Sequence, residues 1–174
     1  MLPLKDVIPP RRFPQLSTAI TVVGGLALPV LWWKGVLDGD QAMLFVVSLL
    51  FLSMFADTVE DRLGPMRFLV VYLVGHAAGT ALSLRLDASA TPLIGLTGPA
   101  VAAIVGAYVV LYPNSRILLL TPVPLDAHEV PAMFFIGLFF ILHVAGGASA
   151  LAPAGAGFAA GALTCLGLKR PMVW

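Results

Sequence analysis

The chain has 174 residues, of which 59% are hydrophobic and only 11% are charged. A soluble domain typically carries about 25% charged residues, and a chain of this length could not hide so much apolar surface from water. The formal net charge is +1 and no cluster of Lys and Arg indicates nucleic-acid binding. The composition therefore excludes a soluble domain and predicts an all-α protein whose solvent is lipid.

Six apolar segments follow one another along the chain, and each is close to the roughly 20 residues that a membrane-spanning helix needs. They cover about residues 17–37, 41–57, 66–86, 93–112, 129–144 and 154–168. Turn-forming residues such as Asp38-Gly39-Asp40 and Gly64-Pro65 separate them. The loops are short, so we expect one membrane domain over residues 1–174, with residues 1–16 as a cytoplasmic lead-in.

The Lys and Arg residues are distributed unevenly between the two ends of these segments. If the N-terminus is cytoplasmic, eight of them lie on the cytoplasmic side, namely Lys5, Arg11, Arg12, Arg62, Arg67, Arg116, Lys169 and Arg170. Only Lys34 and Arg85 lie on the opposite side. Cytoplasmic loops carry the excess of positive charge in membrane proteins, so both termini are expected in the cytoplasm.

Short motifs in a fixed order resemble the rhomboid intramembrane serine proteases. The segment 57–64 (DTVEDRLG) is similar to the end of the family's second helix, and 106–108 (GAY) to its central fourth helix. The segment 129–132 (EVPA) resembles the entry to the fifth helix, and Gly157-Phe158, with Gly161 beyond, the sixth. The resemblance covers most of residues 3–170 and implies a rhomboid-like bundle of six transmembrane helices.

Most of these motif residues have a structural interpretation. Glu60, Asp61 and Arg62 end the second segment, where they can fix helix ends through ion pairs and hydrogen bonds. The small residues Gly106, Gly157 and Gly161 allow membrane helices to approach one another closely. We therefore expect packing roles for the glycines and an anchoring role for the charged cluster.

The family's catalytic positions carry unsuitable side chains in this sequence. Rhomboids use a serine at the start of the fourth helix and a histidine on the sixth, with two oxyanion donors on the second. Two alignments of the 92–108 region place either Thr97 or Gly98 at the serine position. The remaining positions fall on Ala154, Leu44 and Ser48. Nucleophile, base and donors are thus replaced together, and no catalytic residue is expected.

The connection between the first two apolar segments is also unusual for the family. Rhomboids place a long, partly embedded loop there, and it shapes one side of their active site. In this sequence about half a dozen residues around Gly39 connect the two segments. The resemblance therefore implies that the flanks of the second and fifth helices are uncovered.

Two histidines lie within the apolar segments, His76 in the third and His143 in the fifth. Ionisable groups inside a membrane are costly and often functional, so both are candidates for contact with a cofactor or partner. The alternative is hydrogen bonding between helices, since no Asp or Glu accompanies them at similar depth. No cofactor and no metal are predicted.

The leading hypothesis is a catalytically inactive rhomboid-like protein of the bacterial inner membrane. It would contact lipids and bind transmembrane helices of other proteins as a scaffold, a chaperone-like factor or a subunit of a complex. One alternative is a divergent peptidase that uses Thr97, with His143 as the first candidate for its base. Another is a small transporter, although the paired interrupted helices of many transporters are not evident.

Overall fold

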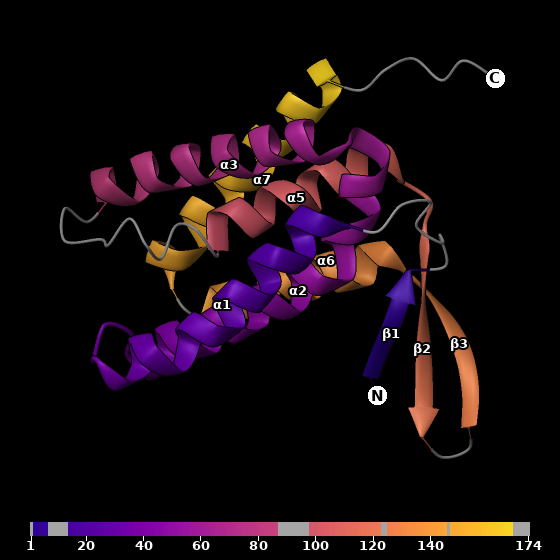
Figure 1. Cartoon of the computed structure of the whole chain (residues 1–174), viewed down its shortest axis with the longest axis horizontal. Helices are drawn as coiled ribbons and strands as arrows, with labels where there is room; N and C mark the ends of the chain where they lie inside the picture. Colours follow the sequence, from indigo (N-terminus) through magenta and orange to yellow (C-terminus); the bar gives the residue numbers. More distant parts are fainter. Residues whose placement is uncertain (1, 7–13, 87–97, 123–124, 146, 169–174) are drawn as a thin grey trace.

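The computed structural model describes residues 2–6, 14–86, 98–122, 125–145 and 147–168, and within them the chain forms six helices and three strands (Figure 1). The helices are α1 (Gln15–Trp33), α2 (Gly39–Leu63), α3 (Pro65–Leu86), α5 (Gly98–Leu111), α6 (Ala132–Ala145) and α7 (Ala148–Leu168). The strands are β1 (Leu2–Asp6), β2 (Arg116–Pro122) and β3 (Leu125–Pro131). Successive helices run in opposite directions, so α1 begins and α7 ends at the same end of the bundle as the sheet.

Four of these helices are long and apolar enough to cross a membrane, namely α1, α2, α3 and the 149–168 stretch of α7. The helices α5 and α6 have 14 residues each. A helix of that length is about 21 Å long, against a hydrocarbon core of about 30 Å. The chain is therefore a mainly helical membrane protein, and the count of six spans stays a prediction.

Several predicted bounds differ from the observed ones. The second helix continues beyond Asp57 to Leu63 and ends at Gly64, whose positive φ of 81° suits a residue without a side chain. The sixth predicted segment begins at Ala148 and not at Ala154, because the helix tolerates Pro153 inside it, as membrane helices can. The predicted 93–112 helix is observed as 98–111, and residues 93–97 lie outside the described part.

The fifth predicted segment was wrong at its start. Glu129 and Pro131 belong to β3, and the helix begins only at Ala132. Residues between the fourth and fifth predicted segments form β2 and the first part of β3, and these two strands pair in antiparallel register with Ile117 opposite Val130. β2 also pairs with β1 from the N-terminal lead-in. This three-stranded sheet in an otherwise helical fold depends on a partner more than 100 residues away, so local sequence could not predict it.

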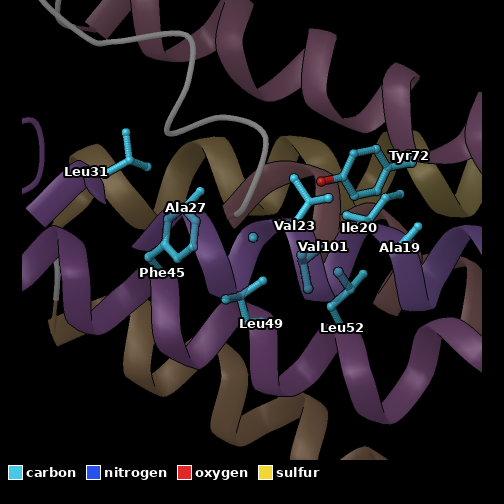
Figure 2. A pocket seen from close by; sticks show the side chains of 11 residues that line it. Ala19, Ile20, Val23, Ala27, Leu31, Phe45, Leu49, Leu52, Tyr72 and Val101 are labelled. Carbon is cyan, nitrogen blue, oxygen red and sulfur yellow. The ribbon is translucent and has the colours of Figure 1, made fainter. Parts of the chain in front are cut away.

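The first helix is fixed at its two ends and packs loosely between them. Ser17 is its only buried residue among the 19 of α1. Near the other end, Leu28 and Leu31 pack on the buried cluster of Leu37, Ala42 and Phe45. Between these points lies an apolar cavity of about 400 Å³, the α1 cavity, walled by α1 from Ala19 to Leu31 (Figure 2). Its floor includes Leu52 of α2 and Val101 of α5.

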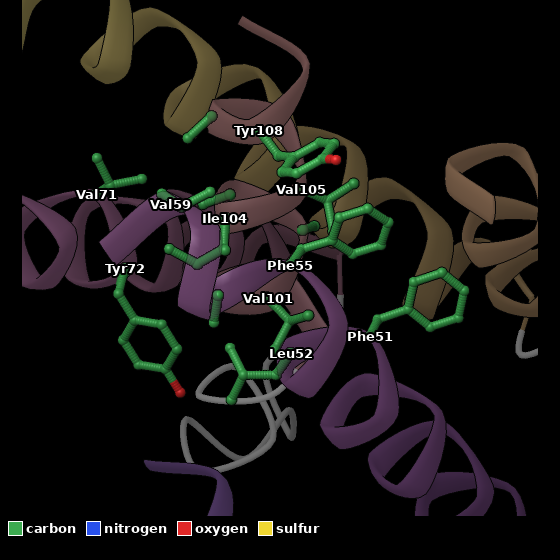
Figure 3. Packing of buried hydrophobic residues seen from close by; sticks show 14 of the residues in the cluster. Phe51, Leu52, Phe55, Val59, Val71, Tyr72, Val101, Ile104, Val105 and Tyr108 are labelled. Atoms are coloured by element: carbon green, nitrogen blue, oxygen red, sulfur yellow. The ribbon is translucent and has the colours of Figure 1, made fainter. Parts of the chain in front are cut away.

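The core of the protein surrounds α5. Ten of the 14 residues of α5, from Pro99 to Tyr108, are buried, and the helix contacts α2, α3 and α7. On the α2 side, aromatic side chains fill the space (Figure 3). The rings of Phe55 and Tyr108 are 4.7 Å apart at an edge-to-face angle of 68°. An apolar helix that is buried all round belongs in the centre of a bundle.

Glycines bring the backbones of α5 and α7 together. A Cβ at Gly161 would overlap the carbonyl oxygen of Ala103, and one at Gly157 would overlap that of Pro99. From the other helix, a Cβ at Gly106 would overlap the carbonyl oxygen of Phe158. Since backbone atoms cannot move aside as a flexible side chain can, these positions require glycine.

We predict that Gly161→Ala destabilises the bundle by about 2 kcal/mol or more, because the new methyl group has no space against the α5 backbone. The matched control is Gly167→Ala on the same helix, where nothing lies within 4 Å of the added Cβ. Gly167→Ala should be neutral or stabilising by up to about 1 kcal/mol, the helix-propensity difference. Thermal unfolding in mild detergent measures both, and equal melting temperatures would contradict the packing.

Candidate functional site

The end of the bundle away from the sheet contains the positions at which a rhomboid would carry its catalytic residues. Here α5 begins at Gly98, and a Cβ at this position would lie 3.6 Å from Nε2 of His143 on α6. His143 is 2% exposed. A buried imidazole nitrogen therefore faces the first residue of α5, and that residue has no side chain.

The orientation of the His143 ring follows from its backbone contact. Nδ1 lies 2.9 Å from the carbonyl oxygen of Phe139, one turn earlier on α6. A carbonyl oxygen can only accept a hydrogen bond, so Nδ1 carries the proton and donates it. In the neutral ring, Nε2, the atom that lies near Gly98, then holds the lone pair. In a catalytic site this would be the arrangement of a general base, but Gly98 offers no hydroxyl to activate.

Ser48 on α2 is fully buried, and its Oγ has no hydrogen-bond partner. The next turn of α2 carries Phe51, whose ring is 5.0 Å from that of Phe139 on α6. Ser48 and His143 each lie about one turn beyond this contact, toward the end away from the sheet. The structure thus places Ser48 and His143 at similar depth, and an unsatisfied buried hydroxyl is uncommon enough to mark the place.

The remaining family positions carry apolar side chains. Ala154 on α7, which the motif comparison predicts at the position of the base, is fully buried. Leu44 on α2 is half-buried. Thr97, the other candidate for the nucleophile position, lies outside the described residues. Of the four described positions, only Ser48 has a polar side chain, and a hydroxyl alone is no base.

His76 lies on α3, away from this group. It is half-buried, and its Nδ1 is 3.3 Å from Oγ1 of Thr80 one turn later. The hydrogen bonds observed for both histidines lie within their own helices and not between helices as expected, because each ring reaches a polar group one turn away on the same helix. Among the described residues, no group of three or more His, Cys, Asp or Glu side chains could hold a metal ion.

The charged cluster at the sheet end holds α1 in place. Glu60 of α2 is 5% exposed, and its two carboxylate oxygens accept the backbone N–H groups of Leu16 and Ser17 at 3.0 and 2.7 Å. The hydroxyl of Ser17 donates to Asp57 at 2.9 Å. The first N–H groups of a helix have no partner within it, so a carboxylate there satisfies them and complements the helix dipole.

A second contact at this end joins α3 to α7. Nη1 of Arg67, in the first turn of α3, donates to the carbonyl oxygen of Leu168 at 3.1 Å. A cation at a helix C-terminus satisfies a carbonyl group that the helix leaves unpaired. The ion pair of Arg116 with Glu129 (3.1 Å) is exposed and contributes little. Arg62, which was expected in the same structural cluster as Glu60, is exposed.

The apolar helices run in alternating directions, and four of them are long enough to cross a membrane. The buried helix α5 begins beside a histidine. These features define the class of the protein as a multi-pass membrane protein. The Rhomboid domain profile matches residues 42–170, which is most of the chain. The chain belongs to the rhomboid family, and the resemblance in its motifs is confirmed. No curated protein and no solved structure matches it.

Sequence patterns did not indicate two features of these sites. The proximity of His143 to Gly98 depends on how α6 packs against α5. The sequence indicated only that His143 lies on the same side of the membrane as residue 97. The use of Glu60 as a cap for α1 joins residues 44 positions apart. The only sequence signal was an acidic residue at a helix end next to a polar helix start.

We predict that Glu60→Ala destabilises the protein by about 2 kcal/mol, because two hydrogen bonds to a charged group are lost and α1 is released at its start. Glu60→Gln keeps one oxygen that can accept, so its cost should be about half. Thermal unfolding in detergent, with protease sensitivity near residue 16, measures the effect. A Glu60→Ala variant as stable as the wild type would show that the cap does not hold α1.

Proposed function

We propose that the protein is a rhomboid without proteolytic activity that binds transmembrane helices of other membrane proteins. The observation that carries the first part is the side chain missing opposite His143. Peptide hydrolysis requires a nucleophile within hydrogen-bond reach of a base and donors for the oxyanion. Gly98 supplies no nucleophile, and the family's base position is the buried methyl group of Ala154.

The predicted loss of catalytic side chains affects more than one position, and this supports a complete loss of activity over a reduced activity. Removing the nucleophile or the base of a catalytic unit alone costs about a million-fold in the best-studied serine hydrolase. Leu44 cannot donate a hydrogen bond to an oxyanion. Of the two predicted oxyanion positions on α2, only Ser48 has a polar side chain. The bundle, in contrast, retains a dense core around α5.

The second part of the proposal concerns the outward faces of α2 and α6. Residues 34–38 alone connect α1 to α2, and Asp38 and Gln41 close this connection as a capping box. The connection between α1 and α2 is therefore too short to cover these flanks. They present exposed apolar side chains, among them Met43, Val46 and Leu50 of α2 and Phe134 and Ile141 of α6. A partner helix could pack there, and this protein would then act as a scaffold, a chaperone-like factor or a subunit of a complex.

We place the protein in the bacterial inner membrane with both termini in the cytoplasm. The sheet end carries Arg62, Arg67 and Arg116, and the opposite end carries Lys34 and Arg85. Together with the basic residues at the two chain ends, this distribution supports the cytoplasmic assignment of the sheet end.

A divergent peptidase is the second candidate, because Nε2 of His143 lies near Gly98, the residue after Thr97. In that mechanism His143 would take the Thr97 hydroxyl proton while the oxygen attacks the scissile carbonyl. The β-methyl group of threonine crowds such an attack, and the following Gly98-Pro99 limits how the turn can adjust. A transporter has less support, because ionisable residues within the helices are few.

We predict that the purified protein in lipid vesicles neither cleaves model transmembrane substrates nor reacts with fluorophosphonate probes. The physical reason is that Gly98, the described residue beside Nε2 of His143, has no nucleophilic side chain. Thr97→Ala and His143→Ala are the matched variants, because contaminating proteases can mimic weak activity. Cleavage that survives purification and disappears in both variants would establish the peptidase and overturn the proposal.

We predict that a photo-reactive residue at position 50 on α2 attaches to other membrane proteins in native membranes. Position 73 on α3 is the matched control, since Leu50 and Leu73 are 47% and 48% exposed in helices of similar apolar character. Discrete protein adducts at 50 and only lipid adducts at 73 are expected. The same adducts at both positions, or none at 50, would argue against the α2 face as a binding surface.

A further inference from the structure

The α1 cavity lies beside a helix that is attached to the bundle at both ends. α1 is attached to α2 at one end by Glu60 and at the other by the Leu37, Ala42 and Phe45 cluster. Between the two attachments, Gly24 approaches α2 so closely that an added Cβ would lie 2.6 Å from Cδ2 of Leu49. The cavity persists although α1 is held from both sides.

The walls of the cavity are apolar almost throughout. The lining residues that the structure describes come from α1, α2, α3 and α5, and among them only Tyr72 has a polar side chain (Figure 2). The floor residues Leu52 and Val101 are each 1% exposed, whereas Val23 at the rim is 65% exposed. The cavity therefore runs from the lipid-facing surface of α1 to the centre of the bundle. An apolar cavity of this kind does not hold water.

The dimensions of the cavity select its occupant. From Ala19 to Leu31 an α-helix rises about 18 Å, so a volume of about 400 Å³ gives a mean cross-section of about 22 Å². An α-helix with side chains is at least about 10 Å wide and covers about 80 Å². A partner helix does not fit, whereas a single extended hydrocarbon chain does.

We propose that the α1 cavity binds one acyl chain of a bilayer phospholipid, which enters from the membrane past Val23. The chain lies along α1, covers the half-buried side chain of Leu49 and reaches Leu52 and Val101 at the floor of the cavity. The lipid thereby supplies the packing that α1 lacks against the bundle. This site is independent of the proteolytic question and of the α2 face.

The test uses the whole protein in vesicles of phosphatidylcholine and phosphatidylglycerol, with a phosphatidylcholine that carries a diazirine in the middle of one acyl chain. After illumination, mass spectrometry maps the residues that carry lipid. Adducts on the peptides of Leu52 and Val101 are expected, because the surrounding lipid cannot reach these side chains from outside. Adducts confined to outward residues such as Val22 and Val30 would overturn the proposal.

Two cavity-filling substitutions and one control test whether lipid labelling at the floor depends on the cavity. Ala27→Phe places a ring inside the cavity and should lower labelling at the floor by about tenfold. Leu26→Phe, one residue away and on the exposed side, should leave it unchanged. Ala19→Leu fills the other end and should act like Ala27→Phe. Floor labelling unchanged in both filled variants would overturn the proposal.

The wild-type map decides the question even if the filled variants fail to fold. A photo-reactive residue at position 101 gives a second, reciprocal measurement, and it should attach to lipid. Attachment to another protein at this position would mean that a partner segment fills the cavity, which would also overturn the proposal.

Discussion

The backbone of α7 lies directly against the backbone of α5, and the positions of the other helices depend on this contact. Gly157 and Gly161 face the carbonyl oxygens of Pro99 and Ala103, where a Cβ would find no space. The 14 residues of α5 are too few to cross a bilayer alone, so its position is set by neighbours that bury it. Gly75 and Gly79 bring α3 against the same two residues of α5.

Because α5 is held so tightly, its first residue is fixed as well. Gly98 lies beside Nε2 of His143, at the end of the bundle where a rhomboid carries out its chemistry. The chain belongs to the rhomboid family, and under our proposal the bundle is retained while the side chains that would perform hydrolysis are replaced. A fold of this kind does not imply the family's reaction, since function resides in specific side chains placed on the fold. Binding of other membrane helices is the role we propose for what remains.

The helix α1 follows a different physical rule from the others. It is anchored by a carboxylate at one end and by a small apolar cluster at the other, and it buries little in between. In water such a helix would dissociate, but in a bilayer lipid can cover both of its sides. An acyl chain in the α1 cavity would make lipid a structural component of the bundle, which explains how a sparsely packed helix can remain in place.

Composition alone determined that lipid surrounds the protein, and turn residues such as Gly64-Pro65 located most helices, because apolar runs and helix breakers are local signals. The motif order also identified the family, and it predicted that Leu44, Ala154 and Thr97 or Gly98 stand at the family's catalytic positions. Only the tertiary structure decided the rest. Glu60 meets Leu16, β1 meets β2, and His143 meets Gly98 across long chain separations, and a linear pattern carries no record of which distant groups come within a few ångströms.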